Sequence, residues 1–122
     1  MKKKTISEDE ILLNVINESI LEKKGISLTT LNLQGIENAV TKYFVICSGS
    51  SNTHTNTIAE YIEYNVRQKI KEKPWKKEGF ENCEWILLDY VTVVVHIFQP
   101  ETREFYSLEK LWADAEQYKI LN

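Results

Sequence analysis

Cysteine is scarce in this sequence and long apolar runs are absent, and both features narrow what the protein can be. The two cysteines, Cys47 and Cys83, form neither a C-x-x-C pair nor a metal-ligand spacing, so we expect reduced thiols, as in the cytoplasm. No apolar run approaches the ~20 residues that cross a bilayer. The basic start at 1–4 is followed by acids at 8–10 rather than by the apolar segment of a signal peptide. The sequence therefore predicts a cytoplasmic protein that is neither exported nor membrane-spanning.

The length and composition predict a single domain over residues 1–122, with a short flexible N-terminus at 1–6. A chain of 122 residues, of which 43% are hydrophobic, can build one core without disulfide or metal staples. No internal repeat, low-complexity stretch or linker divides it.

The charge balance argues against a protein that binds nucleic acid over its whole surface, because the formal net charge is −3. A local exception is the basic stretch 67–77, in which Glu72 is the sole acid. Its cations are Arg67, Lys69, Lys71, Lys73, Lys76 and Lys77. Two interpretations stay open for this stretch: the solvated face and end of a helix, or a contact with RNA phosphate or an acidic partner.

Hydrophobic periodicity predicts an alternation of helices and strands. Ser7 and Glu10 form a capping box before a helix over 8–24, which Gly25 ends. The further predicted elements are strands at 26–33 and 43–47, a helix at 53–72, paired strands at 84–89 and 92–98, and a helical segment from Pro100, with a short strand added near 75–78. The order α-β-β-α-β-β-α predicts an α/β fold with helices packed on a mixed β-sheet.

The strand-to-helix turn at 47–51, Cys-Ser-Gly-Ser-Ser, is the first candidate for chemistry. Small residues at a helix N-terminus can present N–H groups to an anion, and nucleotidyltransferases also place Gly-Ser between a strand and a helix. Such enzymes need two or three adjacent carboxylates for divalent metals. Here the later strand offers only Asp89, because Glu84 points to the opposite face. We therefore expect an N-capped turn, no metal site and no cofactor.

Neither histidine has an assignable catalytic partner. His96 lies in the apolar run 93–98 and is a candidate base, but no nucleophile can be matched to it. The favoured interpretation is a hydrogen-bonded histidine on an apolar strand. His54 lies at a polar helix start. The sequence contains no H-E-x-x-H, Cys/His quartet or G-x-S-x-G, so we expect no catalytic residues and a protein that works by binding.

The strand at 84–89 has large apolar residues on both of its faces. Period-two geometry puts Trp85, Leu87 and Asp89 on one face and the neighbouring residues on the other. Both faces can be covered, one by the core and one by a helix. Alternatively, part of the Trp85 face stays open as a docking surface, in which an aromatic residue is a typical hot spot. Periodicity alone does not decide between these two arrangements.

Three segments resemble the ribosomal silencing factors, or Iojap family. They are E-W-I-L-L-D-Y at 84–90, V-V-H-I-F at 94–98 and P-E-T-R-E-F-Y-S-L-E-K-L-W-A-D-A at 100–115. Y-F-V-I-C-S-G at 43–49 is similar to the family's central strand and turn. The resemblance covers about residues 8–116. The chain departs from the family's usual residues at Asn32, Lys42, Ser107 and Ala113.

The resemblance implies a fold, a function and a set of partners. The fold is nucleotidyltransferase-like but lacks the catalytic carboxylates. The function is that of a translational repressor, which binds the large ribosomal subunit through the large-subunit protein numbered fourteen and sterically blocks subunit joining. The free protein is expected to be a homodimer. A nucleotide-binding or nucleotidyl-transferring enzyme, and an assembly factor for large subunits, are the alternatives.

The docking residues implied by the resemblance combine acids with aromatic side chains, which complement a partly basic partner. The candidates are Trp85, Leu87, Asp89, Tyr90, Glu101 and Arg103. Four apolar residues of the last helical segment are expected to hold it to the sheet instead. These are Phe105, Leu108, Leu111 and Trp112.

Overall fold

The computed structural model describes residues 7–120, so the predicted flexible segment 1–6 lies outside the described residues. The elements in chain order are α1 (Glu8–Glu22), β1 (Ile26–Asn32), β2 (Tyr43–Ser48), α2 (Asn52–Ile70), β3 (Lys76–Glu78), β4 (Trp85–Asp89), β5 (Val93–Phe98), α3 (Pro100–Tyr106), α4 (Leu108–Leu111) and β6 (Glu116–Ile120). No helix within residues 7–120 has the length and apolarity needed to cross a membrane.

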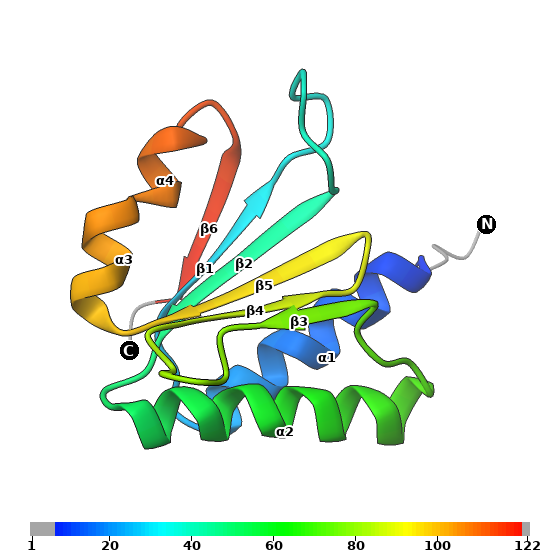
Figure 1. The fold of residues 1–122 in the computed structure, drawn as a ribbon. Helices are drawn as coiled ribbons and strands as arrows, with labels where there is room; N and C mark the ends of the chain where they lie inside the picture. The colour runs from blue at the N-terminus through cyan, green and yellow to red at the C-terminus, as the bar shows by residue number, and fades with distance from the viewer. Residues whose placement is uncertain (1–6, 121–122) are drawn as a thin grey trace.

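The strands of the described chain form one six-stranded mixed sheet in the order β3-β4-β5-β2-β1-β6. The central pair, β2 and β5, is parallel, and the other neighbours are antiparallel. Figure 1 shows α1 and α2 across one face of the sheet and α3 and α4 at one end of the other. The predicted α/β fold with a mixed sheet is confirmed, including the short strand near 75–78.

Helix α1 begins as predicted but ends two residues earlier than expected. The Ser7 hydroxyl accepts a hydrogen bond from the backbone N–H of Glu10 at 3.1 Å, and the apolar face packs on the sheet. The left-handed residue after the helix is Lys24, with φ 60°, and not Gly25. Gly25 is required for close approach instead, because a Cβ there would lie 2.4 Å from Cγ2 of Ile20.

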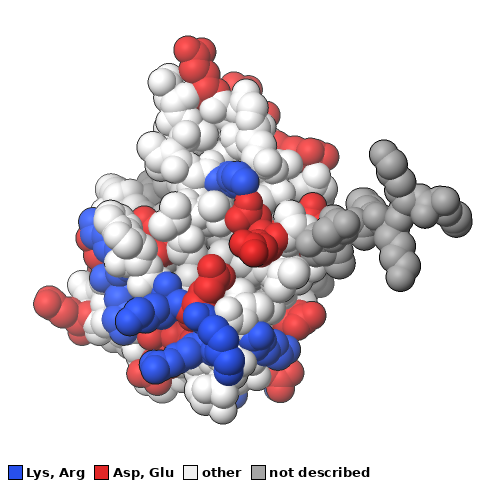
Figure 2. Space-filling model, turned by 90° about the vertical axis from the view of Figure 1, so that its right-hand side faces the viewer, with Lys and Arg blue, Asp and Glu red and all other residues white. Residues whose placement is uncertain are grey.

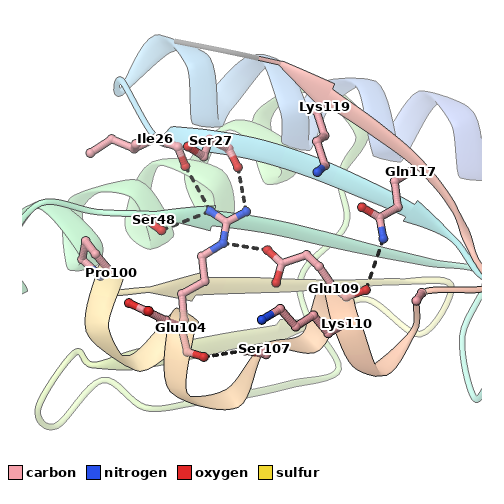
Figure 3. A pocket seen from close by; sticks show the side chains of 12 residues that line it. Ile26, Ser27, Ser48, Pro100, Glu104, Ser107, Glu109, Lys110, Gln117 and Lys119 are labelled. Atoms are coloured by element: carbon pink, nitrogen blue, oxygen red, sulfur yellow. Dashed lines mark hydrogen bonds and ion pairs between the residues drawn. The ribbon is translucent and has the colours of Figure 1, made fainter.

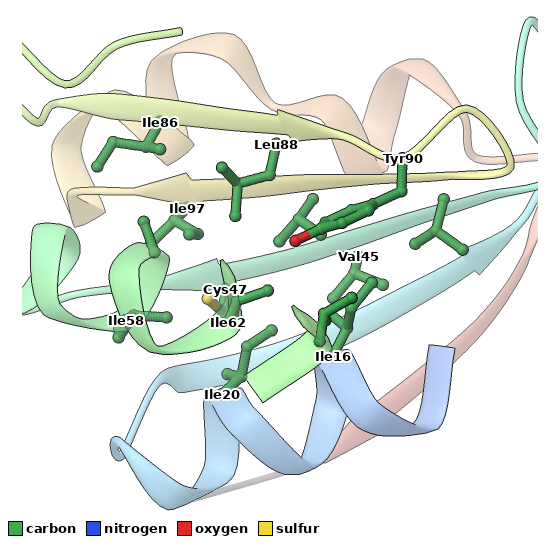
Figure 4. Close-up of a cluster of buried hydrophobic side chains, with 14 of the residues drawn as sticks. Ile16, Ile20, Val45, Cys47, Ile58, Ile62, Ile86, Leu88, Tyr90 and Ile97 are labelled. Carbon is green, nitrogen blue, oxygen red and sulfur yellow. The ribbon is translucent and has the colours of Figure 1, made fainter. Parts of the chain in front are cut away.

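The larger core lies between the sheet and the pair α1 and α2. Figure 4 shows Ile16 and Ile62 of these helices facing Ile97 and Cys47 of the sheet, and all four are fully buried. Helix α2 is capped by the Ser51 hydroxyl, which accepts from the backbone N–H of His54 at 3.0 Å. These two helices therefore cover one whole face of β4, β5 and β2.

A smaller apolar cluster lies on the opposite face, under α3 and α4. Leu108 and Trp112 pack against it as predicted, but Phe105 and Leu111 are 81% and 71% exposed. The expectation that these two residues hold the segment to the sheet is wrong. Ser107 adopts a left-handed φ of 46° between the helices, so the helical spacing that relates residues 105 and 108 is interrupted there.

Strand β6 was not predicted from the sequence. Its five residues, Glu-Gln-Tyr-Lys-Ile, contain no alternating apolar face, and all except the half-buried Gln117 are exposed. The strand is held as the edge of the sheet by antiparallel pairing with β1, in which Thr30 lies opposite Tyr118. Backbone pairing rather than burial therefore accounts for this strand.

Candidate functional site

The two faces of β4 differ in exposure. Ile86 and Leu88 are fully buried under α1 and α2. Trp85, Leu87 and Asp89 are half-buried on the other face. Helices α3 and α4 cover only one end of the sheet on that face (Figure 1), and Trp85 is the residue of β4 whose ring contacts α3, at Tyr106. Of the two arrangements considered for this strand, the structure therefore has the one in which part of the Trp85 face stays open.

Trp85 is held by aromatic neighbours and by one buried histidine. Its ring stacks on Phe98, with centroids 4.9 Å apart, and tilts against Tyr106 of α3 at 4.6 Å. Its indole Nε1–H donates to Nδ1 of His96 at 3.1 Å. Burial lowers the pKa of His96 to about 4, so this ring is neutral at pH 7. The prediction of a hydrogen-bonded histidine on an apolar strand is confirmed.

Asp89 shapes the turn between β4 and β5. Its Oδ1 accepts from the backbone N–H of Val91 at 2.8 Å, and Val91 has a left-handed φ of 75°. A β-branched residue is rarely found in this conformation, and here it presents its side chain to solvent, 60% exposed. The carboxylate therefore stabilises a turn that exposes an apolar side chain.

Next to Asp89, an apolar hollow of about 360 Å³ opens at the end of the sheet. It is lined by Val40, Thr41, Trp75, Asp89, Val91 and Val94. Trp75 is 75% exposed and Val40 is 88% exposed. Neither was a sequence-based candidate, although Trp75 stands among lysines directly after Pro74. A tryptophan among lysines was the signal available in the sequence, whereas its exposure and its place beside the two valines follow only from the fold.

Arg103 does not project from the surface as a docking residue. Its Nε lies 2.7 Å from Oε1 of Glu109, and its terminal nitrogens donate to the carbonyl oxygens of residues 26 and 27 and to the hydroxyls of Ser48 and Thr29. These bonds use all five guanidinium N–H groups. Figure 3 shows this network beside a hollow of about 570 Å³ between α3, α4 and the ends of β1 and β2.

Tyr90 is also unavailable for docking, because its side chain lies in the larger core. It follows Asp89, so strand alternation turns it to the face covered by α1 and α2 (Figure 4). It is 7% exposed, and burial raises the pKa of its phenol. Glu101 of α3 is exposed. Among the predicted docking residues, Trp85, Leu87 and Asp89 thus share one surface, whereas Arg103 and Tyr90 serve the interior.

The turn at 48–51 uses its backbone donors internally. The N–H of Gly49 donates to the Phe98 carbonyl at 2.9 Å, and the N–H of Ser50 donates to Nδ1 of His54 at 2.8 Å. The predicted N-capped turn is confirmed at Ser51. Within residues 7–120, no three His, Cys, Asp or Glu side chains gather into a group that could hold a metal ion.

The basic stretch 67–77 covers the end of α2 and continues into β3. Figure 2 shows Lys and Arg side chains gathered in the lower part of the surface that it presents, with acids among them. Three of the lysines form exposed ion pairs: Lys69 with Glu18 at 3.4 Å, Lys76 with Glu78 at 3.0 Å and Lys77 with Glu63 at 3.2 Å. Arg67 and Lys73 form no ion pair within the described residues.

Comparison with known proteins places the chain in a family. The protein family described as "Ribosomal silencing factor during starvation" matches residues 5–122 of this chain. The chain is 36% identical over 110 residues to "Ribosomal silencing factor RsfS" of Halalkalibacterium halodurans, covering 90% of this chain and 92% of that protein. It is 40% identical over 78 residues to "Mitochondrial assembly of ribosomal large subunit protein 1" of Mus musculus, covering 62% of this chain and 34% of that protein.

A solved structure supports the fold. The crystal structure of a Chromobacterium violaceum protein superposes with a TM-score of 0.81 over 88% of each chain, at 24% identity. The family match over nearly the whole chain, together with the relative from Halalkalibacterium halodurans, agrees with the resemblance found in segments 84–90 and 100–115. This chain belongs to the ribosomal silencing factor family.

Proposed function

We propose that this protein represses translation by binding the large ribosomal subunit through the ribosomal protein numbered fourteen. In this proposal it acts in the cytoplasm by occupying space, so that the small subunit cannot join. Steric occlusion needs affinity and bulk but no catalysis. Membership of the family supports a role on the ribosome, and the name of the mouse relative refers to the large subunit.

The observation that carries the proposal is the partly open face of β4 and its continuation into the apolar hollow. We call this surface the docking face and define it by Trp85, Leu87, Asp89, Trp75, Val91 and Val40. Exposed apolar surface of this kind marks interaction sites, and large aromatic residues dominate binding energy at interfaces. Asp89 adds negative charge to this face, and the exposed Glu101 on α3 is proposed as a further acidic contact outside it, so that both complement a basic partner.

Co-sedimentation with purified large subunits tests the proposal. Trp75→Ala is expected to weaken binding at least tenfold, because a hot-spot truncation removes more than about 1.4 kcal/mol. Tyr64→Ala is the matched control, since Tyr64 is 60% exposed but lies on α2, on the other side of the sheet. Unhindered joining of small subunits at saturating protein would exclude the occlusion mechanism.

The basic stretch is proposed to add a contact with ribosomal RNA. Arg67 and Lys73 are exposed and lack ion-pair partners in the described chain, so both can neutralise phosphates without breaking an internal bond. The double variant Arg67→Glu, Lys73→Glu should weaken subunit binding and flatten its salt dependence, because phosphate contacts release counterions. Unchanged affinity and salt slope would assign the stretch to a solvated helix end.

An assembly factor for large subunits is the alternative, and the name of the mouse relative supports it. Both functions use the same docking face, so binding assays do not separate them. Sucrose-gradient profiles of cells that lack the protein do separate them. Loss of an assembly factor leaves precursor particles, whereas loss of a silencer leaves mature subunits.

We also propose that the free protein is a homodimer, which analytical ultracentrifugation over a range of concentrations will test.

A further inference from the structure

The indole N–H of Trp85 has a partner beneath the docking face. Trp85 lies opposite Phe98 in the β4–β5 register, and His96 lies opposite Leu87. All of these side chains point to the same side of the sheet. The hydrogen bond from Trp85 Nε1 to His96 Nδ1, 3.1 Å long, therefore runs diagonally between neighbouring strands. It joins a half-buried aromatic residue to a ring that is only 4% exposed.

This bond fixes the protonation of His96. Nδ1 accepts, so the proton of the neutral ring resides on Nε2. That Nε2 is buried and has no hydrogen-bond partner among the described residues. Leaving such a group unpaired is destabilising. The flanking rings are those of Phe44, T-shaped at 4.6 Å, and Phe98 at 6.1 Å, so the surroundings favour an apolar side chain at position 96.

A phenylalanine at position 96 would fit this aromatic cluster without an unpaired N–H. What phenylalanine lacks is an acceptor for the indole of Trp85. The indole is otherwise confined by apolar packing, which includes ring contacts with Phe98 and Tyr106. Apolar contacts restrict its position but leave rotation about χ2 less well defined than a directional bond does.

We propose that His96 is a positioning residue that holds the Trp85 ring in the orientation presented at the docking face. The inference rests on the proposed function, because it assigns His96 a role in that docking. Fixing an aromatic side chain before association lowers the conformational entropy lost on binding. His96 acts through Trp85 and makes no contact with the partner itself.

Two substitutions separate positioning from packing. His96→Phe removes the acceptor and keeps an aromatic ring, whereas His96→Asn keeps an oxygen that can accept near the place of Nδ1. His96→Phe should weaken binding to purified large subunits about tenfold, the effect of roughly one hydrogen bond, and His96→Asn should restore most of the affinity. Equal affinity of the wild-type and His96→Phe proteins would overturn the proposal.

The Trp85→Phe background supplies the decisive control. In that background His96→Phe should have no further effect on affinity, because there is no indole left to position. An undiminished effect would show that His96 acts by another route and would also overturn the proposal.

Hydrogen exchange of the Trp85 indole, measured by NMR on the free protein, gives a readout that does not depend on the ribosome. Exchange should be slow in the wild-type and His96→Asn proteins and at least tenfold faster in His96→Phe. If the wild-type protein fails to bind large subunits while this exchange pattern holds, the proposed function fails and the positioning of Trp85 stands. If exchange is the same in all three proteins, the positioning itself is refuted.

Discussion

Arg103 and Glu109 face each other across the break at Ser107, with Nε 2.7 Å from Oε1. Their side chains are 14% and 22% exposed, the most buried ion pair among residues 7–120. Because Arg103 also binds the carbonyl oxygens of residues 26 and 27, one side chain joins α3, α4 and the start of β1. The angle between the two short helices is thus set by a charge network as well as by apolar packing.

Removing one partner of this network should be strongly destabilising. Arg103→Gln leaves Glu109 without its cation and removes the guanidinium hydrogen bonds to the carbonyl oxygens of residues 26 and 27. We expect a loss of about 3 kcal/mol in the free energy of unfolding by urea. The pair Arg103→Gln, Glu109→Gln should be more stable than Arg103→Gln alone, since no unpaired charge remains. A loss below about 1 kcal/mol in the single variant would contradict a structural role for Arg103.

His96 should make stability depend on pH. The pKa of this residue is about 4 in the folded protein and 6.5 in a model peptide, so the unfolded chain binds the extra proton between these values. Stability is then complete above about pH 6.5 and falls as the pH drops toward 4, by about 2 kcal/mol between pH 7 and pH 5. Urea unfolding at both pH values measures this difference, and His96→Phe should lack this part of the pH dependence.

Two glycines with the same backbone requirement should respond differently to alanine. Gly35 and Gly79 have φ values of 84° and 90°, but a Cβ at Gly35 meets open space, whereas one at Gly79 would lie 1.9 Å from the carbonyl oxygen of Trp85. Gly35→Ala should lower the free energy of unfolding by about 1 kcal/mol, from backbone strain alone. Gly79→Ala should lower it by about 3 kcal/mol or more and disturb β4; equal losses in thermal or urea unfolding would argue against this contact.

Cys47 should be unreactive in the folded protein. Its side chain is fully buried, and burial raises the pKa of its thiol to about 12, so almost no thiolate forms at pH 8. In a Cys83→Ser background, reaction with a disulfide reagent should require unfolding and become rapid in urea. Rapid labelling without denaturant would show that the core around Cys47 opens locally.

The parts of the fold that follow from local rules were predictable. The caps at Ser7 and Ser51 and the apolar runs that became β2 and β5 carry their own signals. Strand β6 carries none, since its residues are mostly polar and exposed and are ordered by pairing with β1 and by the hydrogen bond from the Gln117 amide to the Glu109 carbonyl. The interruption of the helix at Ser107 was also not predictable, because the sequence does not indicate that a serine adopts a left-handed conformation. Phe105 and Leu111 were therefore predicted to face the sheet, whereas both are exposed to solvent.

The candidate docking residues show the same division. Trp85, Leu87 and Asp89 share one face because strand alternation is a local property. The same alternation places Tyr90 on the opposite face, where it is buried. The role of Arg103 could not be assigned from the sequence. Its partner Ser48 is distant in sequence, and its partner Glu109 lies beyond the interruption of the helix at Ser107. Trp75, directly before β3, joins the docking face through its backbone N–H, which donates to the Asp89 carbonyl of β4, fourteen residues further along the chain.

The parallel pairing at the centre of the sheet has a consequence for how the chain folds. Tyr43 of β2 lies beside Val93 of β5, fifty residues further along the sequence, and the segment between them contains α2, β3 and β4. Closing such a long loop is entropically unfavourable before its contacts form, and non-local pairings slow folding. We expect α1, β1, β2 and α2 to collapse early and the β4–β5 hairpin to dock in the rate-limiting step, so that the docking face is completed late in folding.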